Sequence, residues 1–281
     1  MVAPTPLGPE GETHWRRREG GVKPRGPSLG GMTVTTRDRR PEAPLNILVV
    51  GLGVIGATYG YLFDRAGHHV EHLVREGSAR AGIDSLDVEI LDGRSDPRGA
   101  PSHGRYRVHH RTRADYDLIV VSVPSGGAAG VMADLDANGV EGPVLLCCGL
   151  WGGREELDGL MAGREFVLGY PVAGGSITGS LLACCVFDHV MLERRDRARF
   201  PHYERVEALF ASCGIGLEHP HDMLEWIWLH MAINAGVVAV AGMYGDVGDT
   251  ARSAERLMGS TRMLARAVRV IWLCQLRLAP W

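Results

Sequence analysis

The segment Leu45-Asn-Ile-Leu-Val-Val-Gly51-Leu-Gly53-Val-Ile-Gly56 contains the pattern that decides the fold. A run of β-favouring apolar residues leads into G-x-G-x-x-G, and a helical pattern follows it. Gly51 permits the tight turn, Gly53 lets a pyrophosphate approach the backbone, and Gly56 allows the helix to pack on the sheet. The first amides of the helix attract anions. The segment predicts a dinucleotide-binding loop made of Gly51, Leu52, Gly53, Val54, Ile55 and Gly56; a glycine-rich turn that binds nothing is the alternative.

Apolar strand-like segments alternate with amphipathic helical segments up to about residue 212. Fully apolar strands between such helices are typical of a parallel sheet covered on both faces. We therefore predict an α/β fold whose N-terminal Rossmann domain, a doubly wound sheet, spans 45–216. The predicted strands are 45–50, 69–74, 117–123, 143–147 and 166–170, with short β-like runs at 88–91, 106–110, 181–187 and 189–193, and the predicted helices are 54–66, one ending near 137, 154–161 and 202–212.

A helical region follows the strands. Asp222-Met-Leu-Glu225 has the form of a capping box, and a long apolar helix is predicted from Met223 to about Ala241. A last helix is predicted at 251–277. We expect residues 217–281 to form a small all-helical domain for substrate binding or dimerisation, with the substrate in the cleft between this domain and the Rossmann domain.

The two ends of the chain carry further expectations. Residues 1–44 are rich in Pro, Gly and Arg and predict a disordered tail, in which Met32 is an alternative start. The last helix carries apolar residues at helical spacing between arginines, which predicts a homodimer.

Composition excludes several classes of protein. The chain has 281 residues and a net charge of −3, so no basic field favours nucleic acid. No apolar run reaches the roughly 18 residues that a membrane span needs. The six cysteines form no C-x-x-C motif, which predicts buried thiols in a reducing cytoplasm and no metal site. Lys23 is the only lysine, which excludes Schiff-base chemistry and a Walker-type phosphate lysine in the folded body.

The end of the second strand indicates which nicotinamide cofactor fits. An acidic residue there suits the ribose 2′-hydroxyl of NAD, whereas an arginine suits the 2′-phosphate of NADP. The strand beginning at His69 ends in Arg75, and Glu71, about 20 residues past Gly51, lies mid-strand. We predict NADP with Arg75 on the 2′-phosphate. Ser122 and Ser125, at the end of strand 117–123, are predicted to contact the cofactor as well.

The chain resembles the ketopantoate reductase family over roughly residues 45–275. The resemblance rests on five segments: Asn46-Ile-Leu-Val-Val-Gly-Leu-Gly-Val-Ile-Gly56, Ala66-Gly-His-His-Val70 with Leu73-Val-Arg75, Asp117-Leu-Ile-Val-Val121, Leu145-Leu-Cys-Cys-Gly149-Leu-Trp-Gly-Gly-Arg-Glu-Glu-Leu157, and Trp228-Leu-His-Met-Ala-Ile-Asn234. The last resembles the family's Trp-x-Lys-x-x-x-Asn helix.

The resemblance implies reduction of a small 2-oxo acid or related ketone by NADPH. A helix lysine of the family protonates the developing alkoxide, and His230 stands at its position here, with Asn234 retained. Pro124 and Cys148 replace a second lysine and an asparagine of the family pattern. An imidazolium is a competent acid near neutral pH, and positions i and i+4 share a helix face. We hypothesise that His230 donates the proton beside Asn234; a histidine packed in a helical core is the alternative.

Three functional readings follow. The first is an NADP-dependent reductase of a small carbonyl compound. The second is a nucleotide-binding protein without redox turnover: a sensor, a partner subunit or a non-redox enzyme. The third is a truncated or degenerate gene, because the family continues for tens of residues beyond this chain's end. The substrate and the direction of reaction stay open.

Overall fold

The structure is a computed structural model that describes residues 43–124 and 126–244. They lie in one compact unit, 40–281. The strands are β1 Asn46–Val50, β2 His69–Leu73, β3 Ser85–Asp92, β4 Ala100–Arg107, β5 Leu118–Val121, β6 Val144–Leu146, β7 Phe166–Thr178, β8 Leu181–Leu192 and β9 Gly216–Glu218. The helices are α1 Val54–Arg65, α2 Ala128–Ala137, α3 Arg154–Met161, α4 Tyr203–Ser212 and α5 Met223–Tyr244.

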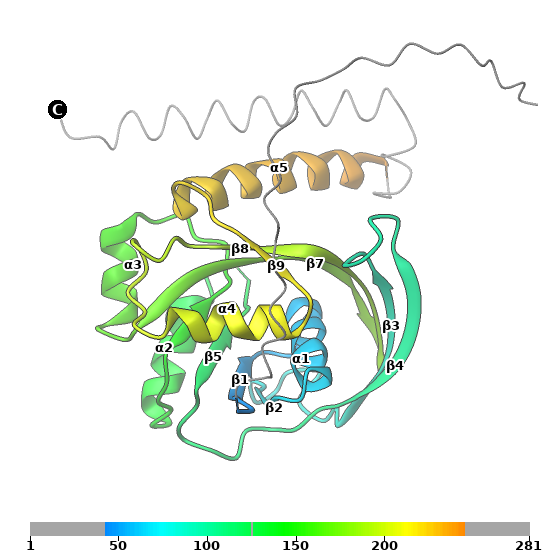
Figure 1. Cartoon of the computed structure of the whole chain (residues 1–281), viewed down its shortest axis with the longest axis horizontal. Coiled ribbons are helices and arrows are strands. Elements are labelled where there is room, and N and C mark those ends of the chain that lie inside the picture. Colours follow the sequence, from blue (N-terminus) through cyan, green and yellow to red (C-terminus); the bar gives the residue numbers. More distant parts are fainter. Residues whose placement is uncertain (1–42, 125, 245–281) are drawn as a thin grey trace, which may run out of the picture. The chain divides into compact units, whose positions relative to one another are not determined.

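One sheet joins the strands in the order β2-β1-β5-β6-β7-β8-β3-β4, and β9 pairs with β8 (Figure 1). The first five strands of this order run parallel, which confirms the predicted α/β fold with a Rossmann-like sheet. The sheet then becomes mixed, because β7 and β8 form a long antiparallel hairpin and β3 and β4 form another. β3 joins the two by pairing parallel to β8.

Alternate residues of the parallel strands face two separate cores. Ile47 and Val49 belong to one buried cluster, together with residues of α1 and α4. Leu48 and Val50 belong to the other, together with residues of α2, α3 and α5. Burying both faces explains why these strands are apolar throughout. The helix after β1 and the helix after β5 therefore lie on opposite faces, which makes the β1–β5 boundary the switch point where such sheets bind ligands.

The second half of the sheet differs from the prediction. The runs predicted at 181–187 and 189–193 are one continuous strand, β8, and the strand predicted to end at 170 continues to Thr178. The run predicted at 106–110 is shifted, because β4 spans Ala100–Arg107 and buries only Tyr106. β9 was not predicted. These strands are held by backbone pairing with neighbouring strands, β8 with β7, β3 and β9, and β4 with β3, which local apolar alternation does not reveal.

The long helix α5 begins where its sequence predicted. The Glu225 amide donates to the Asp222 carboxylate at 3.0 Å, and the Trp226 amide to the Asp222 carbonyl at 3.2 Å, so Asp222 acts as the N-cap. No helix in the described ranges is long and apolar enough to cross a membrane. The last predicted helix, 251–277, and almost all of the predicted tail lie outside the described residues. The helical domain at 217–281 and the homodimer therefore stay predictions.

Candidate functional site: the carboxyl edge of the parallel strands

The glycine loop after β1 has the geometry that its glycines predict. Gly51 has a left-handed φ of +95°, and its amide donates to the Leu73 carbonyl at 2.8 Å, which ties the loop to the end of β2. A Cβ on Gly56 would lie 3.1 Å from the Gly51 oxygen, so helix α1 packs closely on the loop. A Cβ on Gly53 would meet nothing within 4 Å. The space over Gly53 is thus open, as the approach of a phosphate requires.

The other loop residues present only their backbone to that space. Leu52 is buried, and Val54 and Ile55 pack against the core on the α1 side. Gly53 is the N-cap of α1, no side chain caps the helix, and its first turn has no acidic residue. The free amides of this turn make the helix start a suitable anion site.

The two candidate ribose ligands at β2 differ in their surroundings. The Glu71 carboxylate accepts hydrogen bonds from the Thr112 amide at 2.8 Å, the Thr112 hydroxyl at 2.7 Å and the Tyr116 hydroxyl at 2.6 Å. These bonds and nearby Arg113 outweigh burial and lower the pKa of Glu71. Arg75 is exposed and forms no ion pair with any described residue. Its guanidinium can therefore pair with an anion, whereas the Glu71 carboxylate already accepts three hydrogen bonds.

The loops after β5 and β6 lie at the same edge of the sheet, because these strands run parallel to β1. Ser122 is half-buried, and its carbonyl oxygen is 3.7 Å from where a Cβ on Gly51 would be. Ser125 lies outside the described residues. Cys148 is buried, its thiol donates to the Val121 carbonyl at 3.5 Å, and burial raises the pKa of this thiol to about 11. Cys148 is therefore a neutral packing residue.

A cluster of aromatic and polar side chains lies where α5 packs on β7. The Trp226 and His230 rings stack at 4.8 Å between centroids, and the Tyr170 ring lies 4.6 Å from His230 and 5.2 Å from Trp226. Burial lowers the pKa of His230 below its usual 6.5. Burial raises the pKa of Tyr170, and the Asn234 side chain opposes this shift. Tyr170 thus lies beside both His230 and Asn234.

Two residues of this region were missed by the sequence reasoning. Tyr170 follows the part of β7 that pairs parallel with β6, at the same carboxyl edge as Ser122. The rule that ligands gather at strand ends could have identified it. His72 is buried within β2 and its ring contacts the glycine loop, with Nδ1 3.0 Å from the Gly51 oxygen. Nothing local in the sequence indicates that contact.

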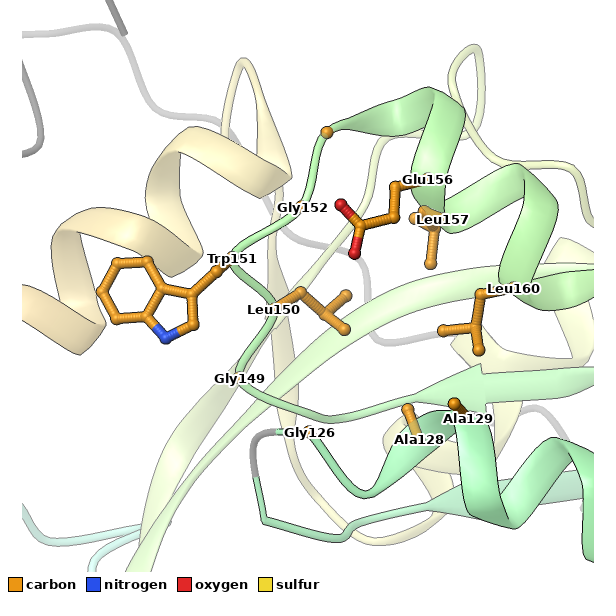
Figure 2. Close-up of a pocket in the computed structure, with 11 residues that line it drawn as sticks. Gly126, Ala128, Ala129, Gly149, Leu150, Trp151, Gly152, Glu156, Leu157 and Leu160 are labelled. Carbon is orange, nitrogen blue, oxygen red and sulfur yellow. The ribbon is translucent and has the colours of Figure 1, made fainter. Parts of the chain in front are cut away.

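A cavity of about 460 Å³ opens beside this edge, between the starts of α2 and α3 and the loop after β6. Figure 2 shows the Leu150 side chain and the Glu156 carboxylate pointing toward each other in it, while the Trp151 ring points away. Leu157 and Leu160 complete an apolar wall. The glycine loop does not line this cavity, so the cavity is separate from the loop. The described residues contain no group of three or more His, Cys, Asp or Glu side chains that could hold a metal ion.

Several solved structures share this fold. The dimeric ketopantoate reductase of Staphylococcus aureus is 13% identical, with a TM-score of 0.55, covering 81% of this chain and 79% of that one. A PanE/ApbA family ketopantoate reductase from Ralstonia eutropha is 16% identical, with a TM-score of 0.54 and coverages of 80% and 73%. The complex of D-mandelate dehydrogenase with NADH is 11% identical, with a TM-score of 0.56, and the match covers 82% of this chain and 74% of that one. At these identities the likeness shows a common fold.

A family model gives the more specific match. No curated protein is similar enough to match. The model described as ketopantoate reductase PanE/ApbA matches residues 47–169, which run from β1 into β7 and include the glycine loop. The resemblance in the α5 segment lies outside this match. Residues 47–169 are therefore similar to the ketopantoate reductase PanE/ApbA family, and the chain shares the fold of solved structures of that family.

Proposed function

We propose that this protein is an NADP-dependent reductase of a small carbonyl compound, with His230 as proton donor. One observation carries the proposal: the parallel strands bring the glycine loop, Ser122 and Tyr170 to one edge of the sheet, and α5 adds His230 and Asn234 at Tyr170. A dinucleotide across the β1–β5 switch point would lie along this edge. The family of residues 47–169 supports an oxidoreductase.

The cofactor assignment rests on open space and free charge. Gly53 leaves room for the pyrophosphate, and the free amides of the first turn of α1 would bind it. Arg75 forms no ion pair with any described residue and can pair with a 2′-phosphate, whereas the Glu71 carboxylate already accepts three hydrogen bonds and lies 3.6 Å from the Arg113 guanidinium. This difference favours NADP over NAD.

Gly53→Ala tests the loop. Its φ of −79° suits alanine and nothing lies within 4 Å of the new Cβ, so the fold should be kept at a cost of about 1 kcal/mol, because alanine is a poorer N-cap than glycine. NADPH affinity should fall at least tenfold in a fluorescence titration, because the methyl group occupies the phosphate space. Gly163→Ala, also with no close neighbour but at a φ of +88°, should lower the melting temperature without changing affinity. Unchanged NADPH binding by Gly53→Ala would contradict the assignment.

The chemical step needs a hydride and a proton. Bound NADPH would supply the hydride to the carbonyl carbon, and the π electrons of the carbonyl move to its oxygen. His230 donates its proton to that oxygen, and the Asn234 amide donates a hydrogen bond that orients it. Stacking on Trp226 fixes the imidazole plane, and half-burial favours the neutral form to which the ring returns after donation.

A second candidate is a nucleotide-binding protein without turnover. The aromatic packing of His230 between Trp226 and Tyr170 favours it, as does the burial of Cys148 where the family pattern has an asparagine. NADPH oxidation with a panel of 2-oxo acids and neutral ketones separates the two. Turnover by the wild type that His230→Ala abolishes, with NADPH affinity kept, supports the reductase. His221→Ala, an exposed residue outside the cluster, is the control. Bound NADPH with no turnover across the panel would favour the second candidate.

We also propose a cytoplasmic homodimer. The five cysteines of the described ranges are all free, in keeping with a reducing compartment. One structural neighbour, the reductase of S. aureus, is dimeric. Light scattering at micromolar concentration should give twice the chain mass of 30.4 kDa, and a monomer would refute the dimer.

A further inference from the structure

His72 is a buried histidine with both ring nitrogens engaged. It lies in β2 with 1% of its surface exposed. Nδ1 is 3.0 Å from the carbonyl oxygen of Gly51, and Nε2 is 2.8 Å from the hydroxyl of Tyr106. One contact thus reaches the glycine loop and the other reaches β4 in the second hairpin (Figure 1).

The partners fix where the protons are. A carbonyl oxygen can only accept a hydrogen bond, so Nδ1 of His72 carries the ring proton and donates it to Gly51. Nε2 of the neutral ring then accepts from the Tyr106 hydroxyl. Burial lowers the pKa of His72 to about 4, which keeps the ring neutral at physiological pH. The two hydrogen bonds therefore run in one direction: Tyr106 donates to His72, and His72 donates to Gly51.

The contact acts on the peptide that faces the phosphate space. In a trans peptide the C=O and the following N–H point in opposite directions. Holding the Gly51 oxygen toward His72 therefore aims the Leu52 amide away from His72. Gly51 has a positive φ, a conformation that glycine leaves without steric penalty, so the loop depends on two contacts: the Gly51 amide donates to Leu73, and the Gly51 carbonyl accepts from His72.

The helix leaves room for this contact. A Cβ on Gly60 of α1 would lie 2.7 Å from the Tyr106 oxygen and 2.9 Å from Nε2 of His72. Only glycine at this position lets the hydrogen-bonded pair lie against the helix.

We infer that His72 is a positioning residue of the dinucleotide site: it holds the Gly51–Leu52 peptide in the phosphate-binding orientation and is itself held by Tyr106. The inference rests on the proposed dinucleotide binding. It also couples the β3–β4 hairpin to cofactor affinity, since Tyr106 belongs to β4.

Two substitutions each keep one hydrogen bond of His72 and remove the other. The Asn amide nitrogen of His72→Asn takes the place of Nδ1 and can still donate to Gly51, but it loses Tyr106. The Gln side-chain oxygen of His72→Gln takes the place of Nε2 and can still accept from Tyr106, but the donor to Gly51 is lost. Both variants lose one hydrogen bond, so a purely structural role predicts similar effects on cofactor binding.

The test is NADPH titration with thermal melting of wild type, His72→Asn and His72→Gln. We expect NADPH affinity within about threefold of wild type for His72→Asn and roughly tenfold weaker for His72→Gln, the worth of one hydrogen bond. Equal affinities of the two variants would overturn the inference.

If the wild type binds no NADPH, the proposed function fails, and the positioning role is read from the Gly51 carbonyl ¹³C shift. That shift should move in His72→Gln and stay in His72→Asn. Movement in both, or in neither, would overturn the inference independently.

Discussion

Replacing Gly60 with alanine should destabilise the protein, although the same change stabilises most helices. Gly60 lies in the middle of α1, where alanine is favoured over glycine by about 1 kcal/mol. The new methyl group would lie 2.7 Å from the Tyr106 oxygen and 2.9 Å from Nε2 of His72. Both side chains have 1% of their surface exposed, so neither can move into solvent.

The change in the free energy of unfolding is set by two opposing effects: the disrupted Tyr106–His72 contact and the higher helix propensity of alanine. Separating the pair leaves a buried hydroxyl and a buried ring nitrogen without partners, at about 1–3 kcal/mol for each group. Overpacking adds about 1–3 kcal/mol where the backbone has to shift. Subtracting the helix gain of about 1 kcal/mol leaves a net loss of roughly 2–8 kcal/mol.

The assay is urea unfolding followed by circular dichroism, with Gly159→Ala as the matched control. Gly159 lies inside α3, and a Cβ there meets nothing within 4 Å, so this variant should gain up to about 1 kcal/mol. Gly60→Ala should also weaken NADPH binding, because it displaces the ring that holds Gly51. If Gly60→Ala stabilises the protein as Gly159→Ala does, the Tyr106–His72 contact is not built as described.

Three further predictions concern charge. Arg75→Ala should weaken NADPH binding by about 10–100-fold and leave NADH unchanged, because one charged contact to the 2′-phosphate is lost; equal weakening in paired titrations would contradict this. The rate of carbonyl reduction should fall as pH rises through a pKa below 6.5, because burial lowers the pKa of His230 and only its protonated form donates; a profile still falling in His230→Ala would assign the step to another group. Arg154→Ala should cost about 1–3 kcal/mol in urea unfolding, because it leaves the buried Glu193 carboxylate without its partly exposed cation; a loss under 1 kcal/mol would show that the Leu168 amide satisfies Glu193 without it.

The first part of the fold could be predicted because its signals are local. Each signal lies in or next to the element that it specifies. These signals are the apolar run of β1 before Gly51, the helical pattern of α1 and the Asp222 cap of α5. The ends of α3 were predicted to the residue. In these elements the sequence pattern and the packing agree.

The hairpins could not be predicted in the same way. β7 passes Gly174 and Gly175, which interrupt an apolar pattern, yet pairing with β8 carries the strand through them. β4 buries one residue, so it shows no alternation and depends on β3. The site follows the same division. The glycine loop was visible in the sequence, and the position of Tyr170 at a strand end could have indicated it. His72 became a candidate only through its contacts with the glycine loop and β4.

We propose that the carboxyl edge of the parallel strands forms one reductase site, from the glycine loop to the α5 cluster. A crystal structure of the protein with bound NADP would show whether it does. We predict the pyrophosphate over Gly53, the 2′-phosphate on Arg75 and the nicotinamide against Tyr170, within reach of a carbonyl held by His230 and Asn234. NADP bound with its nicotinamide away from Tyr170 and His230, or outside the glycine loop, would contradict the account.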